Sequence, residues 1–341
     1  MFDLLTYVAL GMTLTFAFVN GFHDGGNVIA TIIGSRSMHP LRALALATLA
    51  EFIGPVILGT AVSQTIFENI LNRQVLAYLS QTNLSLMIVC GLAGAIIWNL
   101  ITWRLRLPSS SSHALIGGLI GASLATIGGS GVAWDKVVST VALPLLGAPI
   151  VAFVGGLLAF STIAALFAKA HRSLSRLFVN LQTPCMIFLA ASQGSNDAQK
   201  SMGVVALVLF ASGWASQENA GLPHWVVLGC AAALAAGLCV GGWRIVKTVG
   251  YGICRMEPVH SFASQLAAST VILVASLAGG PVSTTQVVSA SVMGVGASRR
   301  LSGVRWQTAR SIAYAWFLTV PFSAGIGACA GWIVIGLFGQ P

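Results

Sequence analysis

Two short polar stretches interrupt long apolar runs of the sequence, and each carries one aspartate. The first, GFHDGGN, holds His23, Asp24 and Asn27, and the second, GSNDAQK, holds Asn196 and Asp197. A carboxylate deep in a bilayer is costly, so it usually faces the protein interior or a watery cavity and serves function. Each stretch is a candidate cation site, and an aspartate that caps a helix at the membrane surface is the structural alternative.

Glycines flank the first aspartate. Gly21, Gly25 and Gly26 predict that the helix unwinds here, because glycine tolerates backbone conformations that other residues avoid. Unwound carbonyl groups together with Asp24 and Asn27 would form an oxygen-rich site suited to Na⁺.

Two hydroxyl-rich stretches supply a different chemistry. PSSSSHALIGG begins at Pro108 and PVSTTQ begins at Pro281. A helix N-terminus with free N–H groups binds anions, whereas ordinary N-capping needs only one hydroxyl. Neither stretch contains lysine or arginine, so an anion would be held by dipoles and hydroxyls. The candidate anion-binding residues are Ser110, Ser111, Ser112, Ser283, Thr284 and Thr285.

Both kinds of motif recur at one distance along the chain. The sequence separation between Asp24 and Asp197 is identical to the separation between Pro108 and Pro281, and we call this separation the repeat offset. A two-fold internal repeat with matching polar interruptions indicates a secondary transporter whose site lies near the middle of the membrane.

The composition requires a membrane. The chain has 341 residues, 56% hydrophobic and only 7% charged, whereas soluble domains carry roughly 25% charged residues. Several apolar runs approach the roughly 20 residues that a helix needs to cross a bilayer, which predicts an all-α integral membrane protein in a lipid bilayer. The net charge of +9 does not indicate nucleic acid as a partner, because the basic residues fall at helix ends. The basic stretches 169–176 and 299–305 are expected to be cytoplasmic.

The apolar runs divide the chain into two repeats. We expect residues 1–168 to form the first transmembrane repeat, 169–182 a basic cytoplasmic linker and 183–341 the second repeat. Re-entrant hairpins are predicted at about 106–128 and 278–298. Run 137–168 contains two prolines and is expected to kink or bend back. Three runs are too short to span a bilayer and are expected to be re-entrant or broken: 114–127, 202–215 and 286–297.

At these four motifs the chain resembles the PiT family of inorganic phosphate transporters, in a prokaryotic form. That family has a duplicated G-x-N-D-x-x-N stretch and a P-[IV]-S-x-[ST]-H hairpin in each half, and the resemblance covers residues 1–338. It implies inverted repeats with broken helices, two re-entrant hairpins and homodimers. It also implies that phosphate binds at the six hydroxyl residues and that a coupling cation binds at Asp24, Asn27, Asn196 and Asp197, which would be metal ligands if the ion is Na⁺.

Departures from the family pattern bear on the coupling ion. His23 and Lys200 stand where the two motifs usually have asparagine. The ammonium group of Lys200 could take a cation position and repel Na⁺, and histidine titrates near neutral pH. Both changes favour H⁺ over Na⁺ as the coupling ion.

Three further polar residues stand in or beside apolar runs. Glu51 is a glutamate within an apolar run and is expected to take part in coupling, with pairing to Arg42 or to a loop cation as the alternative. Gln265 stands where many members carry a glutamate, and Gln286 replaces the second hairpin histidine. The roles of these two replacements stay open.

The sequence thus predicts a secondary active transporter and no enzyme. It would import inorganic phosphate by cation symport through alternating access in the plasma (inner) membrane, and it needs no cofactor beyond the coupling cation. Hydrogen phosphate can donate its P–OH to a carboxylate, whereas sulfate has no proton to give. A sulfate permease on the same scaffold stays open, as does an anion channel. Phosphate could also enter as a neutral metal–phosphate complex.

Overall fold

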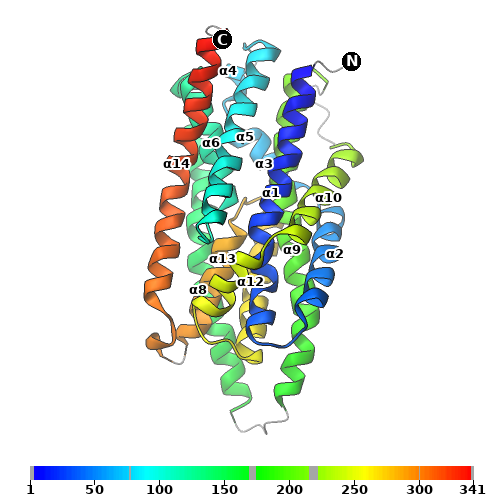
Figure 1. The fold of residues 1–341 in the computed structure, drawn as a ribbon, viewed down its shortest axis with the longest axis vertical. Coiled ribbons are helices and arrows are strands. Elements are labelled where there is room, and N and C mark those ends of the chain that lie inside the picture. Colours follow the sequence, from blue (N-terminus) through cyan, green and yellow to red (C-terminus); the bar gives the residue numbers. More distant parts are fainter. Residues whose placement is uncertain (1–3, 77, 169–173, 215–221, 299, 339–341) are drawn as a thin grey trace.

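The structure is a computed structural model that describes residues 4–76, 78–168, 174–214, 222–298 and 300–338. Helices run along one long axis, and both ends of the chain lie at the same end of the molecule (Figure 1). Among the described residues, six helices are long and apolar enough to cross a membrane, or seven if the bent pair of α10 and the following short helices forms one span. The chain is therefore a multi-pass helical membrane protein, as predicted.

The first half of the chain runs from α1 to α8. Its elements are α1 (Leu4–Gly34), α2 (Pro40–Ile57), α3 (Ala61–Asn69), α4 (Arg73–Leu76), α5 (Gln81–Arg104), α6 (Ser111–Thr126), α7 (Trp134–Lys136), the π-helical segment η2 (Val137–Ala142) and α8 (Leu143–Leu166).

The second half runs from α9 to α14 and repeats this order in outline. Its elements are α9 (Leu174–Ala211), α10 (His224–Val240), α11 (Trp243–Lys247), the π-helical segment η3 (Thr248–Gly252), α12 (Pro258–Leu277), α13 (Thr284–Ala297) and α14 (Trp306–Phe338).

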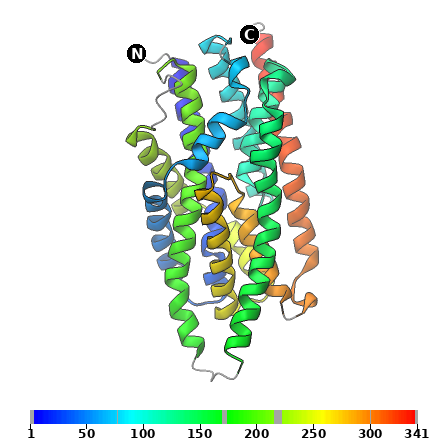
Figure 2. The ribbon, with the colours of Figure 1, turned by 180° about the vertical axis from the view of Figure 1, so that it is seen from behind.

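Each half contains one long helix that turns back into a short one. Helix α5 turns into α6 and packs against it, and α12 does the same with α13. The short helices have 16 and 14 residues, about 24 and 21 Å at 1.5 Å per residue, which is less than a bilayer core of about 30 Å. Helix α6 lies in the half of the molecule nearer the termini and α13 in the other half (Figures 1 and 2). The two helix pairs therefore approach from opposite ends.

Details of the two helix pairs also match at the repeat offset. The turn after α5 places Arg106 in the left-handed region with φ 60°, and the turn after α12 places Gly279 there with φ 73°. These two residues are separated by the repeat offset. An isolated β-bridge closes each unit behind its hairpin, Leu71 with Val132 and Cys254 with Val304.

The predicted unwinding at Gly21–Gly26 is wrong. Helix α1 is continuous from Leu4 to Gly34, and its glycines allow neighbouring backbones to approach. A Cβ atom at Gly21 would lie 1.9 Å from the Leu234 carbonyl oxygen, and one at Gly26 would lie 2.3 Å from the Gly242 carbonyl oxygen. Close helix packing, with small residues at the contact, explains these glycines.

Two predicted boundaries also differ from the structure. Run 202–215 is not a separate short segment, because α9 continues from Leu174 through the second acidic stretch to Ala211. Residues 174–182 of the expected linker form the first turns of α9, and 169–173 lie outside the described residues. Run 137–168 does not bend back: residues 134–166 form one candidate span, entered through the π-helical segment η2.

Candidate functional site

The four polar motifs meet in the interior of the molecule. Asp24 lies on α1 and Asp197 on α9, and the N-termini of α6 and α13 come between these helices. All thirteen residues proposed from the sequence are at most 2% exposed: Asn27, Asn196, Asp24, Asp197, His23, Lys200, Glu51, Ser110, Ser111, Ser112, Ser283, Thr284 and Thr285. Buried polar groups at this density require partners or a ligand.

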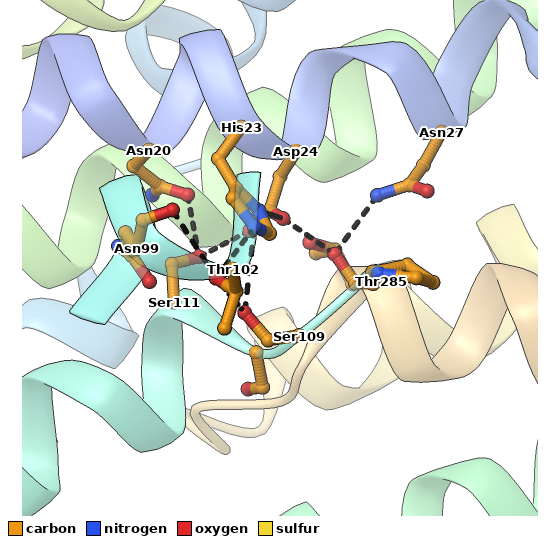
Figure 3. Close-up of polar contacts among 12 residues, drawn as sticks. Asn20, His23, Asp24, Asn27, Asn99, Thr102, Ser109, Ser111 and Thr285 are labelled. Carbon is orange, nitrogen blue, oxygen red and sulfur yellow. Dashed lines mark hydrogen bonds and ion pairs between the residues drawn. The ribbon is translucent and has the colours of Figure 1, made fainter. Parts of the chain in front are cut away.

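The carboxylate of Asp24 accepts hydrogen bonds from both hairpins (Figure 3). Thr285 Oγ1 donates to Asp24 Oδ1 at 2.6 Å, and Ser111 Oγ donates to Asp24 Oδ2. Asn27 Nδ2 donates to Thr285 Oγ1 at 2.8 Å, which leaves Asn27 Oδ1 buried and without a partner among the described residues. Asp24 is thus the point at which α1, α6 and α13 are joined.

His23 connects Asp24 to a buried chain of hydroxyls. Its Nδ1 lies 2.7 Å from Asp24 Oδ1, and its Nε2 lies 3.1 Å from Thr102 Oγ1 and 3.3 Å from Ser109 Oγ. The two hydroxyls are 2.7 Å apart. One ring nitrogen faces the carboxylate and the other faces hydroxyls that can donate or accept, so the ring bridges Asp24 and these hydroxyls.

Asp197 has a cation of its own. Lys200 Nζ lies 2.5 Å from Asp197 Oδ1, and both side chains are 1% exposed. The ammonium group also donates to the Val282 carbonyl oxygen at 2.9 Å, and Thr284 Oγ1 donates to Asp197 Oδ2 at 3.0 Å. Lys200 therefore occupies the space in which a free cation would meet this carboxylate.

The two hairpin tips touch each other. Gln286 Nε2 lies 3.2 Å from His113 Nδ1, and Ser112 Oγ donates to the Val282 carbonyl oxygen at 3.1 Å. These contacts bring the N-termini of α6 and α13 together between the two aspartates.

Two of the six predicted hydroxyls have an ordinary structural task. Ser110 Oγ accepts from the His113 N–H, and Ser283 Oγ accepts from the Gln286 N–H, so each caps its own helix. The hydroxyls of Ser111, Thr284 and Thr285 face the aspartates instead. The capping alternative thus describes the first of the three predicted residues in each hydroxyl run, Ser110 and Ser283.

Three predicted residues are close to this centre without joining it. Asn196 donates to Ser276 Oγ at 2.8 Å, away from the Lys200 ammonium group. Gln265 Nε2 donates to Thr31 Oγ1 at 2.9 Å. Neither carboxylate oxygen of Glu51 has a hydrogen-bond partner among the described residues.

Sequence reasoning missed several residues of the site. Asn20 Oδ1 lies 2.7 Å from Ser111 Oγ, Gln193 Nε2 donates to the Asp24 carbonyl oxygen at 3.2 Å, and Thr102 and Ser109 contact His23. Asn99 is fully buried, and neither of its amide atoms has a partner in the described part of the chain. Helical spacing offered a signal for Asn20 and Gln193, because each lies one turn before an aspartate.

Comparison with known proteins identifies the family to which this chain is similar. The sequence model of the phosphate transporter family matches residues 20–176 and 166–327. The chain is 38% identical over 338 residues to the "Probable low-affinity inorganic phosphate transporter" of Mycobacterium leprae, with 99% of this chain and 80% of that protein covered. It is 36% identical over 336 residues to the Bacillus subtilis protein of the same name, with 98% of both covered.

A solved structure has the same fold. "The sodium-dependent phosphate transporter" superposes with a TM-score of 0.82 and 25% sequence identity, covering 98% of this chain and 100% of that one. Fold and relatives together define a membrane transporter and not an enzyme. The chain belongs to the phosphate transporter family, as the resemblance of its motifs implied.

Proposed function

We propose that the protein imports inorganic phosphate by symport with a cation, and that this cation is H⁺ in preference to Na⁺. The phosphate binds where the N-termini of α6 and α13 meet. Curated relatives are named as inorganic phosphate transporters, which supports phosphate over the sulfate alternative.

The hydroxyl arrangement supports this anion site. Ser111 and Thr284 sit in the first turns of two helices whose N-termini carry partial positive charge. Their hydroxyls donate to aspartates in the arrangement described and can turn to donate to a phosphate oxygen. A P–OH group of hydrogen phosphate can in turn donate to a carboxylate, an interaction that sulfate cannot make.

The ion pair between Lys200 and Asp197 is the observation that carries the choice of coupling ion. A fixed ammonium group at 2.5 Å neutralises the second carboxylate and excludes a second cation by repulsion. Of the two aspartates, Asp24 is then the one left to accept an external cation, and His23 Nδ1 lies 2.7 Å from its Oδ1. Glu51, fully buried and without an ion-pair partner in the described part of the chain, is a second candidate carrier because a protonated carboxyl tolerates burial far better than a carboxylate.

Na⁺ is the alternative coupling ion, and two observations favour it. The similar solved structure is titled a sodium-dependent transporter. The buried oxygens Asn27 Oδ1 and Asn196 Oδ1 lack hydrogen-bond partners among the described residues and are suitable ligands for a hard cation.

The distribution of basic residues supports an orientation. The loops that join α1 to α2, η3 to α12 and α13 to α14 lie at the end opposite the termini (Figure 1). In sequence these loops contain Arg36, Arg255, Arg300 and Arg305. We place this end, together with the basic stretch after α8, in the cytoplasm of the cell whose plasma membrane holds the protein. Phosphate then moves from the end of the termini to the basic end.

Alternating access follows from the same arrangement. We treat 1–168 and 183–341 as inverted repeats, supported by hairpins that enter from opposite ends (Figure 1) and match at the repeat offset. Rocking of one repeat against the other would expose the shared site to each side in turn. The family resemblance adds a homodimer to this proposal.

Binding to purified protein tests the proposed substrate. Phosphate at millimolar concentration is expected to raise the apparent melting temperature, because a ligand that binds only the folded state stabilises it. Sulfate at the same concentration should raise it much less. The variant Thr285→Val is expected to lose the phosphate effect, whereas Thr270→Val, on the exposed side of α12, should keep it. Equal stabilisation by both anions would contradict the preference for phosphate.

A further inference from the structure

We propose that the coupling cation leaves Asp24 through a buried file of polar side chains that opens to the cytoplasmic end only. This inference rests on the proposed function. The file consists of Asn27 and Thr31 on α1 and Ser35 in the turn directly after it, with two partners from the second half, Gln265 and Gln182.

The file follows one face of α1. Asp24, Asn27, Thr31 and Ser35 are spaced by three, four and four positions, which places them on the same side of an α-helix. Thr31 is seven positions beyond Asp24 and Ser35 is eleven positions beyond it, so these steps extend about 10 and 16 Å along the axis. The first three residues of the face are at most 2% exposed. The face runs to the C-terminal end of α1, opposite the chain termini (Figure 1).

Each step has a polar partner from a facing helix. Thr285 bonds both Asp24 and Asn27, and Gln265 Nε2 donates to Thr31 Oγ1 at 2.9 Å. At the end of the file, Ser35 Oγ donates to Gln182 Oε1 at 2.9 Å, and Gln182 Nε2 donates to Ser37 Oγ at 2.8 Å. Three successive hydrogen-bonded groups therefore line this face of α1 from the carboxylate to the end of the helix.

The free atoms of the file suit a cation and not an anion. The amide groups of Asn27, Gln182 and Gln265 all donate their N–H to hydroxyls of the file or its end. The two side-chain atoms of the file that are buried without a partner in the described part of the chain are oxygens, Asn27 Oδ1 and Gln265 Oε1. Neutral oxygens can solvate H₃O⁺ or Na⁺ without trapping it, whereas a phosphate anion would require donors.

The equivalent positions of the other half hold apolar side chains in place of polar ones. At the repeat offset, the positions equivalent to those of the file hold Val204 and Val208 on α9, Ala9 on α1 and Leu92 on α5, and these four belong to one buried apolar cluster. The position equivalent to Asn27 is Lys200. Two halves with the same architecture therefore differ along this face, which is polar towards the cytoplasmic end and apolar towards the other.

A one-sided exit predicts a specific kinetic defect. Net phosphate uptake requires release of the cation inside, whereas exchange of internal for external phosphate, with saturating cation on both sides, does not. Thr31→Val and Gln265→Leu are therefore expected to lower net uptake at least tenfold while exchange stays within about twofold of the wild type. Thr31→Ser keeps the hydroxyl and should restore net uptake.

Val204→Thr is the matched control. It places a hydroxyl at the equivalent position of α9, where the hydroxyl can bond to its own helix, and it should leave the ratio of net uptake to exchange unchanged. If the ratio of net uptake to exchange in Thr31→Val and Gln265→Leu equals that of the wild type, the exit file is overturned. This holds whether both rates fall in proportion or neither changes. Absence of phosphate exchange in the wild type would contradict the proposed function itself.

Discussion

The side chains of His113 and Gln286 are hydrogen-bonded to each other at 3.2 Å, although 173 residues separate them along the chain. They occupy the same position in α6 and α13, and the backbone N–H of each donates to a serine that caps its own helix. In the proposed inverted repeat, equivalent residues of the two halves meet only near the axis that relates them. Under that proposal the contact marks this axis, and the proposed phosphate site surrounds it.

Close packing of α1 predicts a selective effect of alanine at its glycines. Gly21→Ala would place a Cβ 1.9 Å from the Leu234 carbonyl oxygen, so the helices must move apart, which costs about 1–3 kcal/mol or more. Gly11, on the same helix, has no atom within 4 Å of its would-be Cβ. Thermal unfolding in detergent should show a lowered midpoint for Gly21→Ala and an unchanged midpoint for Gly11→Ala. Equal midpoints would contradict the packing described.

The buried ion pair predicts non-additive stability. Asp197→Asn leaves the Lys200 ammonium group buried without its partner, which is expected to destabilise the protein by about 3–5 kcal/mol. Lys200→Met leaves the Asp197 carboxylate buried without its partner. The double variant should be more stable than either single variant, because no unpaired charge remains. Additive losses in a double-mutant cycle would show that the two groups do not interact in the membrane.

Removal of the lysine predicts a gain of sodium binding. Lys200→Asn restores the asparagine of the family motif and leaves Asp197 in need of a cation. Na⁺ is expected to raise the melting temperature of this variant and to have little effect on the wild type. The same stabilisation by Na⁺ in both proteins would show that Lys200 does not exclude the ion. Choline at equal concentration controls for ionic strength.

His23 predicts the pH dependence of uptake. In the wild type, uptake is expected to rise as the external side becomes more acidic, because the proposed coupling ion is H⁺. His23→Asn should flatten this profile, because the side chain next to Asp24 no longer accepts a proton. The profile is measured as the initial rate of phosphate uptake at saturating phosphate over a series of external pH values. A profile that keeps its shape in the variant would assign proton binding elsewhere, with Glu51 as the next candidate.

Much of this architecture could be predicted from the sequence. The repeat offset located both acidic stretches and both hydroxyl runs, and the short runs that begin near positions 114 and 286 marked the helices that are too short to span a bilayer. Asp24, Asp197 and the hydroxyls between them lie together in the structure, although their ligands remain a proposal.

Other features are visible only in the folded structure. Gly21, Gly25 and Gly26 suggested flexibility, but the same residue type also permits close helix contacts, and composition does not distinguish the two. The partners of Gln265 were equally hidden, because Thr31 lies 234 residues away in a part of α1 without charge. Asn99 stands alone in an apolar helix and gave no periodic signal.

Uptake of radiolabelled phosphate into proteoliposomes, driven by an imposed pH gradient without sodium and with excess sulfate present, tests the central claim most directly. We predict accumulation above equilibrium that sulfate does not block and that Asp24→Asn abolishes. Absence of accumulation until sodium is added would contradict proton coupling, and loss of the signal in sulfate would contradict the assignment of phosphate as the substrate.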